Sequence, residues 1–494
     1  MKNKLWRRLY LAADLLLMLA IAALVPINLY VYRFPEWVML LAVGLLTVVN
    51  GGFVEKFDPR KLYKVLLIIA AVPVVLFSLA GSYCNPYWNS QLVREQSPET
   101  LACDQLLTYD QAKNDLDYTM HYLLKCHPFF LERTSHNVQV KYRNALERLQ
   151  NSHEITVTDL RREVQGILSS IGDAHTTCWG KWSDERYLRT MDARKSAGWH
   201  LAAVNGTPVQ TLFEENKSLF SYEVESWGLA QLESCLETRN GLFLLGIDPE
   251  NVKYTWENDR GLTEDEIYTA EDFLLYDDYV AHNLAFSTTE ESQQSFVSYT
   301  IDDSKGLALL TLKECRYNQE YIDCLRDMFA EARDKDIYSV AVDLRGNGGG
   351  SSLVADEFIR YLDVEQFRTG RYKWRFNFVA VPFDQDVIRN RKYDDFTFDG
   401  NVYVLTDNDS FSSAMLFAEY IKDNDLGMII GEAPGNTPNG YGEIAVFYLP
   451  ESHLYFQVST KEFFRVDEDT SDKLVVPDVP CESGKALTTL YNTL

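Results

Sequence analysis

The chain has 494 residues and a formal net charge of −25, a length that allows a membrane segment together with one or two globular domains. The charge is uneven, because residues 1–83 hold nine of the 47 Lys and Arg residues but only four of the 72 Asp and Glu residues. The remainder is therefore strongly acidic. This acidity argues against nucleic acid as a partner, since phosphates would be repelled.

Three apolar runs fill the first part of the chain: Leu9–Val31, Trp37–Val54 and Val65–Tyr83. Each has about the eighteen to twenty-odd residues that a helix needs to cross a bilayer, so we expect residues 1–83 to form a three-helix transmembrane anchor in the lipid bilayer. Basic residues mark the cytoplasmic side, and Met1–Arg8 and Glu55–Lys64 are basic. The pattern predicts a multi-pass protein of the cell membrane whose remaining residues lie on the extracytoplasmic side.

All eight cysteines follow residue 83. On an oxidising side, an even number fits disulfides, whose pairing the sequence does not give, and some of the thiols could equally be buried and free. No CxxC pair or Cys/His cluster has the spacing of a zinc site, so we expect no metal site and no cofactor.

The rest of the chain divides by pattern. Residues 84–107 contain Pro, Asn and Ser and read as a stalk, and residues 108–180 show apolar residues at helical spacing, which predicts a helical subdomain. Residues 181–300 form a mixed insert. Within it, Trp199–Phe213 predicts two short strands around an Asn-Gly turn, followed by a helix.

Residues 301–494 alternate between strand and helix patterns, which predicts an α/β core with right-handed crossovers. The expected strands are Leu307–Leu312, Val340–Leu344, Phe376–Val381, Val402–Thr406, Met428–Gly431, Ile444–Leu449 and Leu454–Val458. The expected helices are Glu320–Asp334, Leu353–Leu362 and Ser412–Lys422.

The first glycine-rich corner follows the strand Val340–Leu344 and reads RGNGGGSS. Glycines let a substrate carbonyl approach bare backbone N–H groups, and such groups can hold a developing oxyanion. A phosphate-binding loop is disfavoured because no Lys-Ser/Thr follows and the spacing is not GxGxxG. A plain tight turn stays open as the alternative.

The second corner, SFSSA, lies about sixty residues further on, at the start of the helix Ser412–Lys422. A serine at this place faces the positive end of the helix dipole, and the Ser413 N–H could join an oxyanion hole. An ordinary serine cap is the alternative. A serine nucleophile also needs a base. Of the eight histidines, His175 in LSSIGDAHTTCW follows an apolar helix face beside a Gly-Asp break.

Together, VDLRGNGGG, the SFSSA helix with IIGE after it, and GDAHT resemble the C-terminal processing (tail-specific) serine peptidases. The resemblance extends to the tricorn core peptidase and interphotoreceptor retinoid-binding protein, and it covers roughly Asp115–Val479. It implies a crotonase-like α/β fold, often with a PDZ-like insert. It implies a nucleophile at Ser412 and oxyanion donors near Gly348 and Gly349 and at the amide of Ser413.

The chain departs from the tail-specific branch where that branch has its catalytic lysine, because Thr437 occupies the matching position. The tricorn-like branch instead uses an upstream His, which His175 matches, and a downstream acid. Asp467 in FFRVDED is the candidate acid, with Glu468 and Asp469 as alternatives. Only AAVNGTPVQTLF resembles the closing part of the PDZ-like insert, so a reduced insert is expected.

The expected fold class is therefore an α/β, crotonase-like peptidase core with an N-terminal helical subdomain and a reduced PDZ-like insert, preceded by three transmembrane helices. The expected function is a membrane-anchored, extracytoplasmic serine peptidase that cleaves peptide or protein substrates through a Ser412–His175 acyl-enzyme mechanism assisted by an acid. The alternative is a binding or sensor module that keeps the fold without the chemistry, as the missing lysine suggests.

Overall fold

The computed structural model describes residues 85–92, 97–258, 260–284, 295–384 and 387–494, with a few isolated positions before them. The chain forms two compact units, residues 1–97 with 445–447 and residues 98–444 with 448–494. In the first unit, residues 85–92 form tight turns in which the N–H and Oγ of Ser90 both donate to the Tyr87 carbonyl (2.9 and 2.7 Å). The second unit contains the fold that follows.

The predicted fold class was wrong in placing three transmembrane helices before the core. Among the described residues, no helix combines the length and the apolar composition that crossing a membrane requires. The three apolar runs themselves lie almost wholly outside the described residues.

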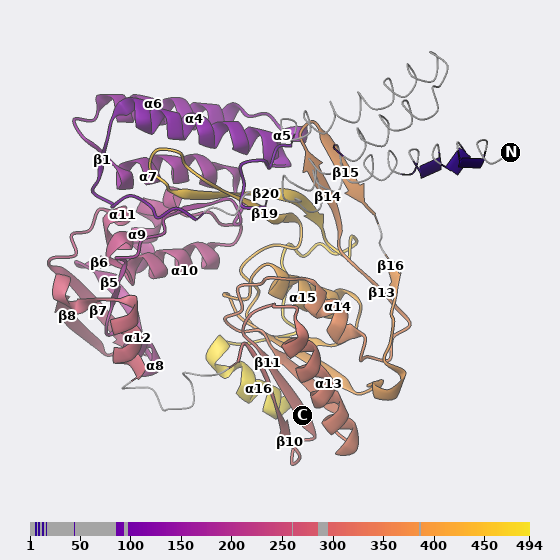
Figure 1. The fold of residues 1–494 in the computed structure, drawn as a ribbon. Coiled ribbons are helices and arrows are strands. Elements are labelled where there is room, and N and C mark those ends of the chain that lie inside the picture. Colours follow the sequence, from indigo (N-terminus) through magenta and orange to yellow (C-terminus); the bar gives the residue numbers. More distant parts are fainter. Residues whose placement is uncertain are drawn as a thin grey trace. The chain divides into compact units, whose positions relative to one another are not determined.

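A six-stranded sheet forms the α/β core, with the strand order β10-β11-β12-β17-β18-β21 (Figure 1). β10 is antiparallel to β11, and the other neighbours run parallel. The strands are β10 (Val297–Asp302), β11 (Leu307–Leu312), β12 (Ser339–Asp343), β17 (Asn401–Thr406), β18 (Met428–Gly431) and β21 (Val479–Pro480). The apolar runs of the central strands β11, β12 and β17 are largely buried on both faces, as parallel strands covered by helices require.

Helices cover the two faces of this sheet. α13 (Gln319–Asp334), α14 (Leu353–Ile359) and α15 (Ser413–Asp423) share one large hydrophobic core with the strands. α16 (Ala486–Thr493) packs Ala486 and Leu490 against a smaller cluster that contains Tyr403 and Ile430. The predicted alternation of strands and helices from residue 301 onward fits this architecture.

A second sheet has the order β15-β14-β20-β19, and β3 pairs with β20. Its strands are β14 (Arg371–Phe376), β15 (Val379–Phe383), β19 (Gly440–Tyr448), β20 (Tyr455–Phe464) and β3 (Cys178–Trp179), and beside it β13 (Gln366–Arg368) pairs with β16 (Val387–Arg389). The single strand predicted over Phe376–Val381 was wrong, because Asn377 takes a positive φ of 53° and turns the chain between β14 and β15.

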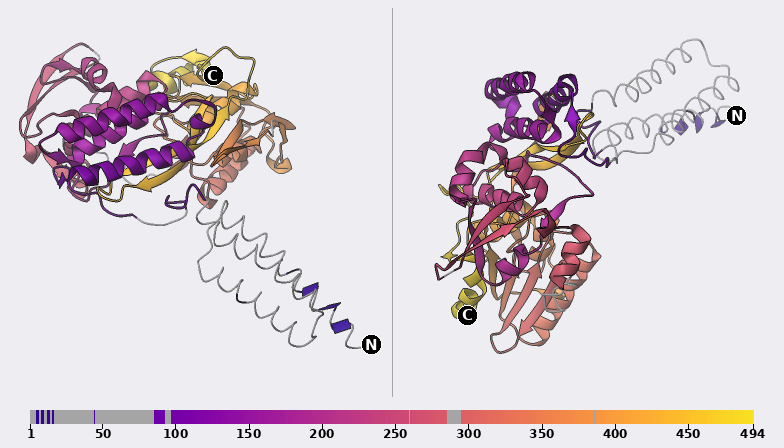
Figure 2. Two further views of the ribbon diagram at one scale, coloured as in Figure 1. Left: turned by 90° about the horizontal axis from the view of Figure 1, so that it is seen from above. Right: turned by 90° about the vertical axis from the view of Figure 1, so that its left-hand side faces the viewer.

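The predicted helical subdomain contains α4 (Tyr109–Cys126), α5 (Phe129–Glu132), α6 (His136–Asn151) and α7 (Val157–Leu168). The side chains of Thr108 and Thr156 begin α4 and α7 with capping boxes. α4 packs over β20 (Figure 2). At this contact the Tyr118 and Phe456 rings meet edge to face, with 6.3 Å between their centroids. The subdomain therefore covers the second sheet.

The insert has its own hydrophobic core, which includes the fully buried Phe213, Tyr254 and Trp256. Its sheet has the order β6-β5-β7-β8, with β5 (Trp199–Val204), β6 (Thr207–Pro208), β7 (Val252–Asn258) and β8 (Thr263–Tyr268). The predicted turn lies between β5 and β6, where Asn205 and Gly206 have φ of 51° and 83°. Helices α8 (Met191–Ser196), α9 (Val209–Asn216), α10 (Glu225–Leu236), α11 (Arg239–Leu245) and α12 (Tyr276–Leu284), with the pair β4 (Arg186–Leu188) and β9 (Phe273–Leu275), complete it.

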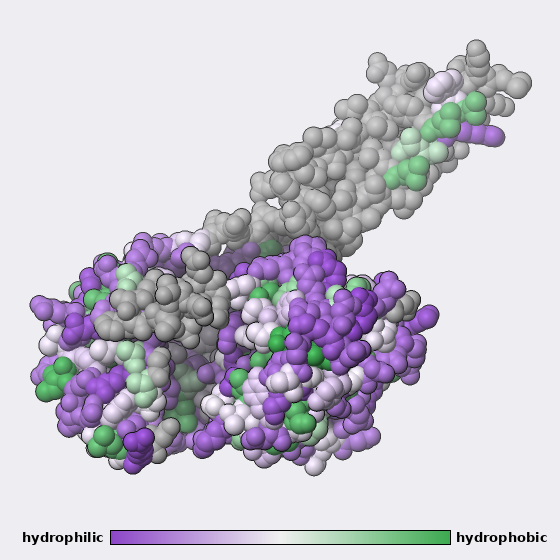
Figure 3. Space-filling view, turned by 90° about the horizontal axis from the view of Figure 1, so that it is seen from below, coloured by the Kyte–Doolittle hydropathy of each residue, from purple (hydrophilic) through white to green (hydrophobic). Residues whose placement is uncertain are grey.

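On the face shown in Figure 3, hydrophilic residues dominate the described surface and hydrophobic residues lie scattered among them. Among the described cysteines, six are free thiols, of which Cys103, Cys178 and Cys315 are buried and Cys235, Cys324 and Cys481 are partly buried.

Candidate active site

The two glycine- and serine-rich corners meet at one edge of the core sheet. β12 and β17 are neighbouring parallel strands, so the loops at their carboxyl ends lie side by side. The Asp407 carboxylate joins the two loops, because it accepts from the Gly346 N–H (3.0 Å) and from the Ser410 N–H (2.9 Å).

The fully buried side chain of Asn347 holds the glycine-rich corner, residues 345–352, in place. Its Nδ2 donates to the Leu312 carbonyl (2.8 Å), and its Oδ1 accepts from the Gly349 N–H (2.8 Å). The Gly349 amide is thus already used within the protein. In the described part of the chain, the N–H groups of Gly348 and Ser413 donate to no protein acceptor.

Gly349 touches the serine corner directly. It has a φ of 99°, and a Cβ at this position would lie 2.7 Å from Ser412 Cβ and 3.0 Å from the Ser413 nitrogen. Only a residue without a side chain permits this approach. The geometry therefore places bare backbone N–H groups beside the Ser412 side chain.

Ser412 occupies a strained turn immediately before α15, with φ 54° and ψ −117°. A positive φ is uncommon for a non-glycine residue, and such outliers cluster at functional sites. The turn is held by the Ser412 N–H, which donates to Oδ1 of the buried Asn436 (2.7 Å). The Ser413 hydroxyl is occupied, since it donates to the Gly350 carbonyl (2.8 Å).

His175 and Ser412 line the same cavity, which has a volume of about 710 Å³. The His175 side chain is buried, and neither ring nitrogen has a hydrogen-bond partner among the described residues. The imidazole lies against the Phe411 ring (4.6 Å between centroids), and Phe411 stacks on Trp227 of α10 (4.1 Å). Because Phe411 precedes Ser412, this stack ties the position of the imidazole to the serine corner.

The pairing of β3 with β20 brings the His175 loop to this place. Gln457 of β20 donates from its backbone N–H to the Thr177 carbonyl (2.9 Å) and from Nε2 to the His175 carbonyl (2.7 Å). His175 is therefore anchored on the second sheet, and Ser412 on the core sheet.

Asp173 lies beside the imidazole and is fully buried. Its Oδ1 accepts from the His175 backbone N–H (2.9 Å) and lies 3.8 Å from Nδ1 of the ring. Its Oδ2 contacts Nε2 of the buried His127 (2.9 Å) and accepts from the hydroxyls of Thr176 (2.5 Å) and Ser459 (2.7 Å). Nδ1 of His127 accepts from the Phe129 N–H (3.2 Å), which assigns the His127 proton to Nε2.

These contacts set the charges at the site. Burial alone would raise the pKa of Asp173, but its hydrogen bonds, above all the one from His127, hold that pKa well below its usual range. Burial lowers the pKa of His175, whereas the charge of the Asp173 carboxylate opposes this shift. The imidazole is thus neutral at neutral pH and lies beside an ionised carboxylate, a state suited to a general base.

Sequence reasoning missed Asp173, and it also missed Glu223, which precedes α10. Glu223 Oε2 accepts from the Thr437 N–H (2.9 Å) and hydroxyl (2.6 Å). Burial and the nearby Asp173 charge raise the pKa of Glu223 to about 7. One atom from each of Asp173, His175 and Glu223 lies within 4.8 Å of the other two, a grouping that could hold a metal ion. No local signal marks Glu223, because it reaches the site only through the packing of the insert.

The structure does not bring Asp467 to the cavity wall. Its backbone N–H donates to Asp423 (3.2 Å), and its carboxylate accepts from the Asp469 N–H (3.3 Å). Of the two alternative acids, Glu468 pairs with Arg371, and Asp469 is exposed. The carboxylate that lies beside His175 is that of Asp173.

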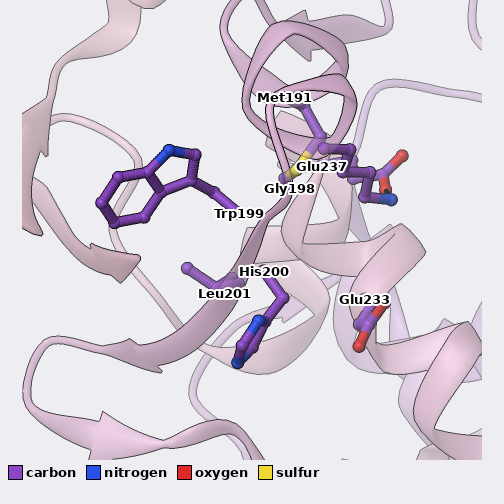
Figure 4. Close-up of a pocket in the computed structure, with 8 residues that line it drawn as sticks. Met191, Gly198, Trp199, His200, Leu201, Glu233 and Glu237 are labelled. Atoms are coloured by element: carbon purple, nitrogen blue, oxygen red, sulfur yellow. Dashed lines mark hydrogen bonds and ion pairs between the residues drawn. The ribbon is translucent and has the colours of Figure 1, made fainter. Parts of the chain in front are cut away.

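A second cavity, of about 310 Å³, lies within the insert (Figure 4). His200 of β5 and Glu233 of α10 line it, together with Trp199 and the ion pair between Lys195 and Glu237. Among the described residues that line this cavity, none is a serine or a cysteine. The larger cavity beside Ser412 is therefore the candidate active site.

Comparison with known proteins supports this choice. Residues 307–481, which carry both corners, match the sequence model of peptidase family S41. No curated protein matches the sequence. Among solved structures, mature CPAF is similar with a TM-score of 0.55 at 11% identity, over 78% of this chain and 95% of that one.

Two further structures are similar. Mature CPAF in complex with lactacystin gives a TM-score of 0.54 at 12% identity, over 78% of this chain and 96% of that one. The photosystem II D1 C-terminal processing protease gives 0.44 at 13% identity, over 76% and 94%. At these identities, the likeness to mature CPAF shows a shared fold.

Proposed function

Residues 307–481 match peptidase family S41, and from this match we propose that the chain is a serine peptidase of the C-terminal processing type that cleaves peptide bonds with Ser412 as nucleophile and His175 as general base. The single observation that carries the proposal is the shared cavity. A strained serine and a buried imidazole without a partner line the same space.

In the first step, Ser412 Oγ attacks the peptide carbonyl while a ring nitrogen of His175 takes the hydroxyl proton. The imidazolium then gives this proton to the leaving amine, which leaves an acyl-enzyme at Ser412. A water molecule, deprotonated by the same imidazole, hydrolyses the ester and restores the serine.

We propose the backbone N–H groups of Gly348 and Ser413 as the oxyanion donors, because neither has an acceptor among the residues that the structure describes. Gly349 was also predicted as an oxyanion donor, but its N–H donates a hydrogen bond to Asn347 Oδ1. Its role is steric, since its missing side chain lets the loop touch Ser412. Losing one oxyanion donor typically costs about 10²–10³ in rate.

Asp173 takes the role that the sequence prediction gave to Asp467. Its Oδ1 lies 3.8 Å from His175 Nδ1, and its negative charge stabilises the imidazolium that forms during attack. Hydrogen bonds from Thr176, Ser459 and His127 keep this carboxylate ionised and in place.

The substrate is a peptide or protein segment. Met415, Leu416, Tyr372 and Phe463 line the cavity together with polar residues, and we propose that they bind an apolar substrate side chain near the cleaved bond. The extracytoplasmic location stays a prediction that rests on the sequence.

The test is labelling by an active-site-directed fluorophosphonate. We expect the wild-type chain to be labelled and Ser412→Ala not to be. The control is Ser351→Ala, which removes another hydroxyl that lines the same cavity and should keep the label. Equal labelling of Ser412→Ala and wild type would refute Ser412 as nucleophile. An unchanged labelling rate in His175→Ala would refute His175 as base.

A further inference from the structure

We propose that Asp173, His175 and Glu223 bind a divalent transition-metal ion of the zinc type and that the bound ion reversibly inhibits the peptidase. The three groups come from two distant segments, yet one atom of each lies within 4.8 Å of the others. The binding part of this proposal stands on the geometry alone. The inhibitory part rests on the proposed role of His175 as base.

Each group keeps an unused lone pair for a metal. Both ring nitrogens of the buried His175 lack a hydrogen-bond partner within the described residues. Three side chains, those of His127, Thr176 and Ser459, donate to Oδ2 of Asp173. Among the described residues, Oδ1 accepts one hydrogen bond, from the His175 backbone N–H. Both short bonds to Glu223 reach Oε2, and Oε1 accepts only a long bond of 3.5 Å from the Ala174 N–H.

The charge at the site also favours a cation. Two carboxylates lie close together, and neither forms an ion pair with a Lys or Arg in the described part of the chain. Of the described basic side chains, those within ion-pair distance of Asp173 are His127 and His175. A divalent ion would offset both negative charges at once.

The ligand set selects the ion. One imidazole with two carboxylates suits zinc and its neighbours, whereas Mg²⁺ and Ca²⁺ prefer oxygen ligands only. Zinc bonds to nitrogen and oxygen of about 2.0–2.2 Å in a tetrahedron place the ligand atoms about 3.3 Å apart. The Asp173 Oδ1 to His175 Nδ1 separation is 3.8 Å, so a small closure of the side chains completes the site. Access is through the 710 Å³ cavity that His175 lines.

Inhibition follows from the chemistry of the imidazole. A ring nitrogen that donates its lone pair to a metal cannot take the proton of the Ser412 hydroxyl, and the bound charge also disfavours a second proton on the ring. Removal of the ion by a chelator should restore the base and therefore the activity.

Binding is tested by calorimetric titration of Zn²⁺ into the full chain carrying Ser412→Ala, so that turnover plays no part. We expect one tight site, about 10–100-fold weaker binding in Glu223→Gln, and unchanged binding in Glu225→Gln, which alters an exposed acid of the same segment. Mg²⁺ should give no binding heat at this site. Equal zinc affinity in Glu223→Gln and Glu225→Gln would overturn the site.

Cysteine thiols are the competing zinc ligands, and Co²⁺ distinguishes them from the proposed site. Cobalt at the proposed site should show d–d absorption without a thiolate charge-transfer band, and a strong band of that kind would assign the metal to cysteine and overturn the proposal. Labelling of wild type by the fluorophosphonate should fall with zinc and recover with a chelator. Tight zinc binding that leaves the labelling rate unchanged would overturn the inhibitory part. If no labelling occurs under any condition, the proposed function is contradicted, and the calorimetry alone decides whether the metal site exists.

Discussion

Replacing Gly349 by Ala should disable the site, whereas the same change at the neighbouring Gly348 should not. At Gly349 the new Cβ would lie 2.7 Å from both the Phe411 carbonyl oxygen and Ser412 Cβ, with the backbone at a φ of 99°. At Gly348 a Cβ meets nothing within 4 Å, and the φ is not positive. The two variants therefore add the same methyl group to adjacent residues in opposite environments.

The magnitude follows from two costs at Gly349. An alanine in this backbone region costs about 1–3 kcal/mol, and forcing a methyl group into a packed contact costs about 1–3 kcal/mol more. The chain can relieve both by moving the glycine loop away from Ser412. A displacement of about 1 Å at a reacting group can cost about 10² in rate.

The assay is the rate of fluorophosphonate labelling together with the melting temperature of each variant. We expect Gly349→Ala to react about 100-fold more slowly and to melt earlier than wild type, and Gly348→Ala to stay close to wild type in both. Wild-type labelling by Gly349→Ala would refute the close approach of the two corners. An equal loss in Gly348→Ala would show that steric contact is not the cause.

Two further outcomes are expected. Trp227→Ala removes the ring on which Phe411 stacks. Because an aromatic pair contributes about 0.5–1.5 kcal/mol, fluorophosphonate labelling should slow about 2–10-fold. Trp227→Phe keeps an aromatic ring and should restore most of the rate. Burial raises the pKa of Glu419 in α15 to about 8. A carboxyl with a raised folded-state pKa contributes stability that is complete below its unfolded pKa, near 4.3, and that is lost as the pH rises toward 8. Denaturant unfolding should therefore show stability falling over this range by on the order of 4 kcal/mol in wild type, whereas Glu419→Gln, which keeps an acceptor for the Val466 N–H, should show a flatter profile. An identical decline in the variant would contradict this assignment.

Local pattern was sufficient for the elements of the core. The apolar runs at β11 and β18 predicted both strands with their observed bounds, since a short apolar run between turn residues is a local property. The Asn-Gly turn at Asn205 was predicted for the same reason. The strand predicted across Asn377 failed because the alternation of apolar residues continues through a turn that no Gly or Pro marks.

What the sequence by itself determined is the family resemblance, the two corners and the identity of Ser412 and His175 as candidates, because each lies within a short segment whose residue types carry the signal. Only the tertiary structure decided which carboxylates accompany them. Asp467 follows the expected order along the chain, but its hydrogen bonds are with Asp423 and Asp469. Glu223 and Trp227 instead reach the site from the insert. The physical reason is that contacts between distant segments depend on how β3 pairs with β20 and how α10 packs against the serine corner. The spacing of residues along the chain does not determine how far apart these segments lie in the folded protein.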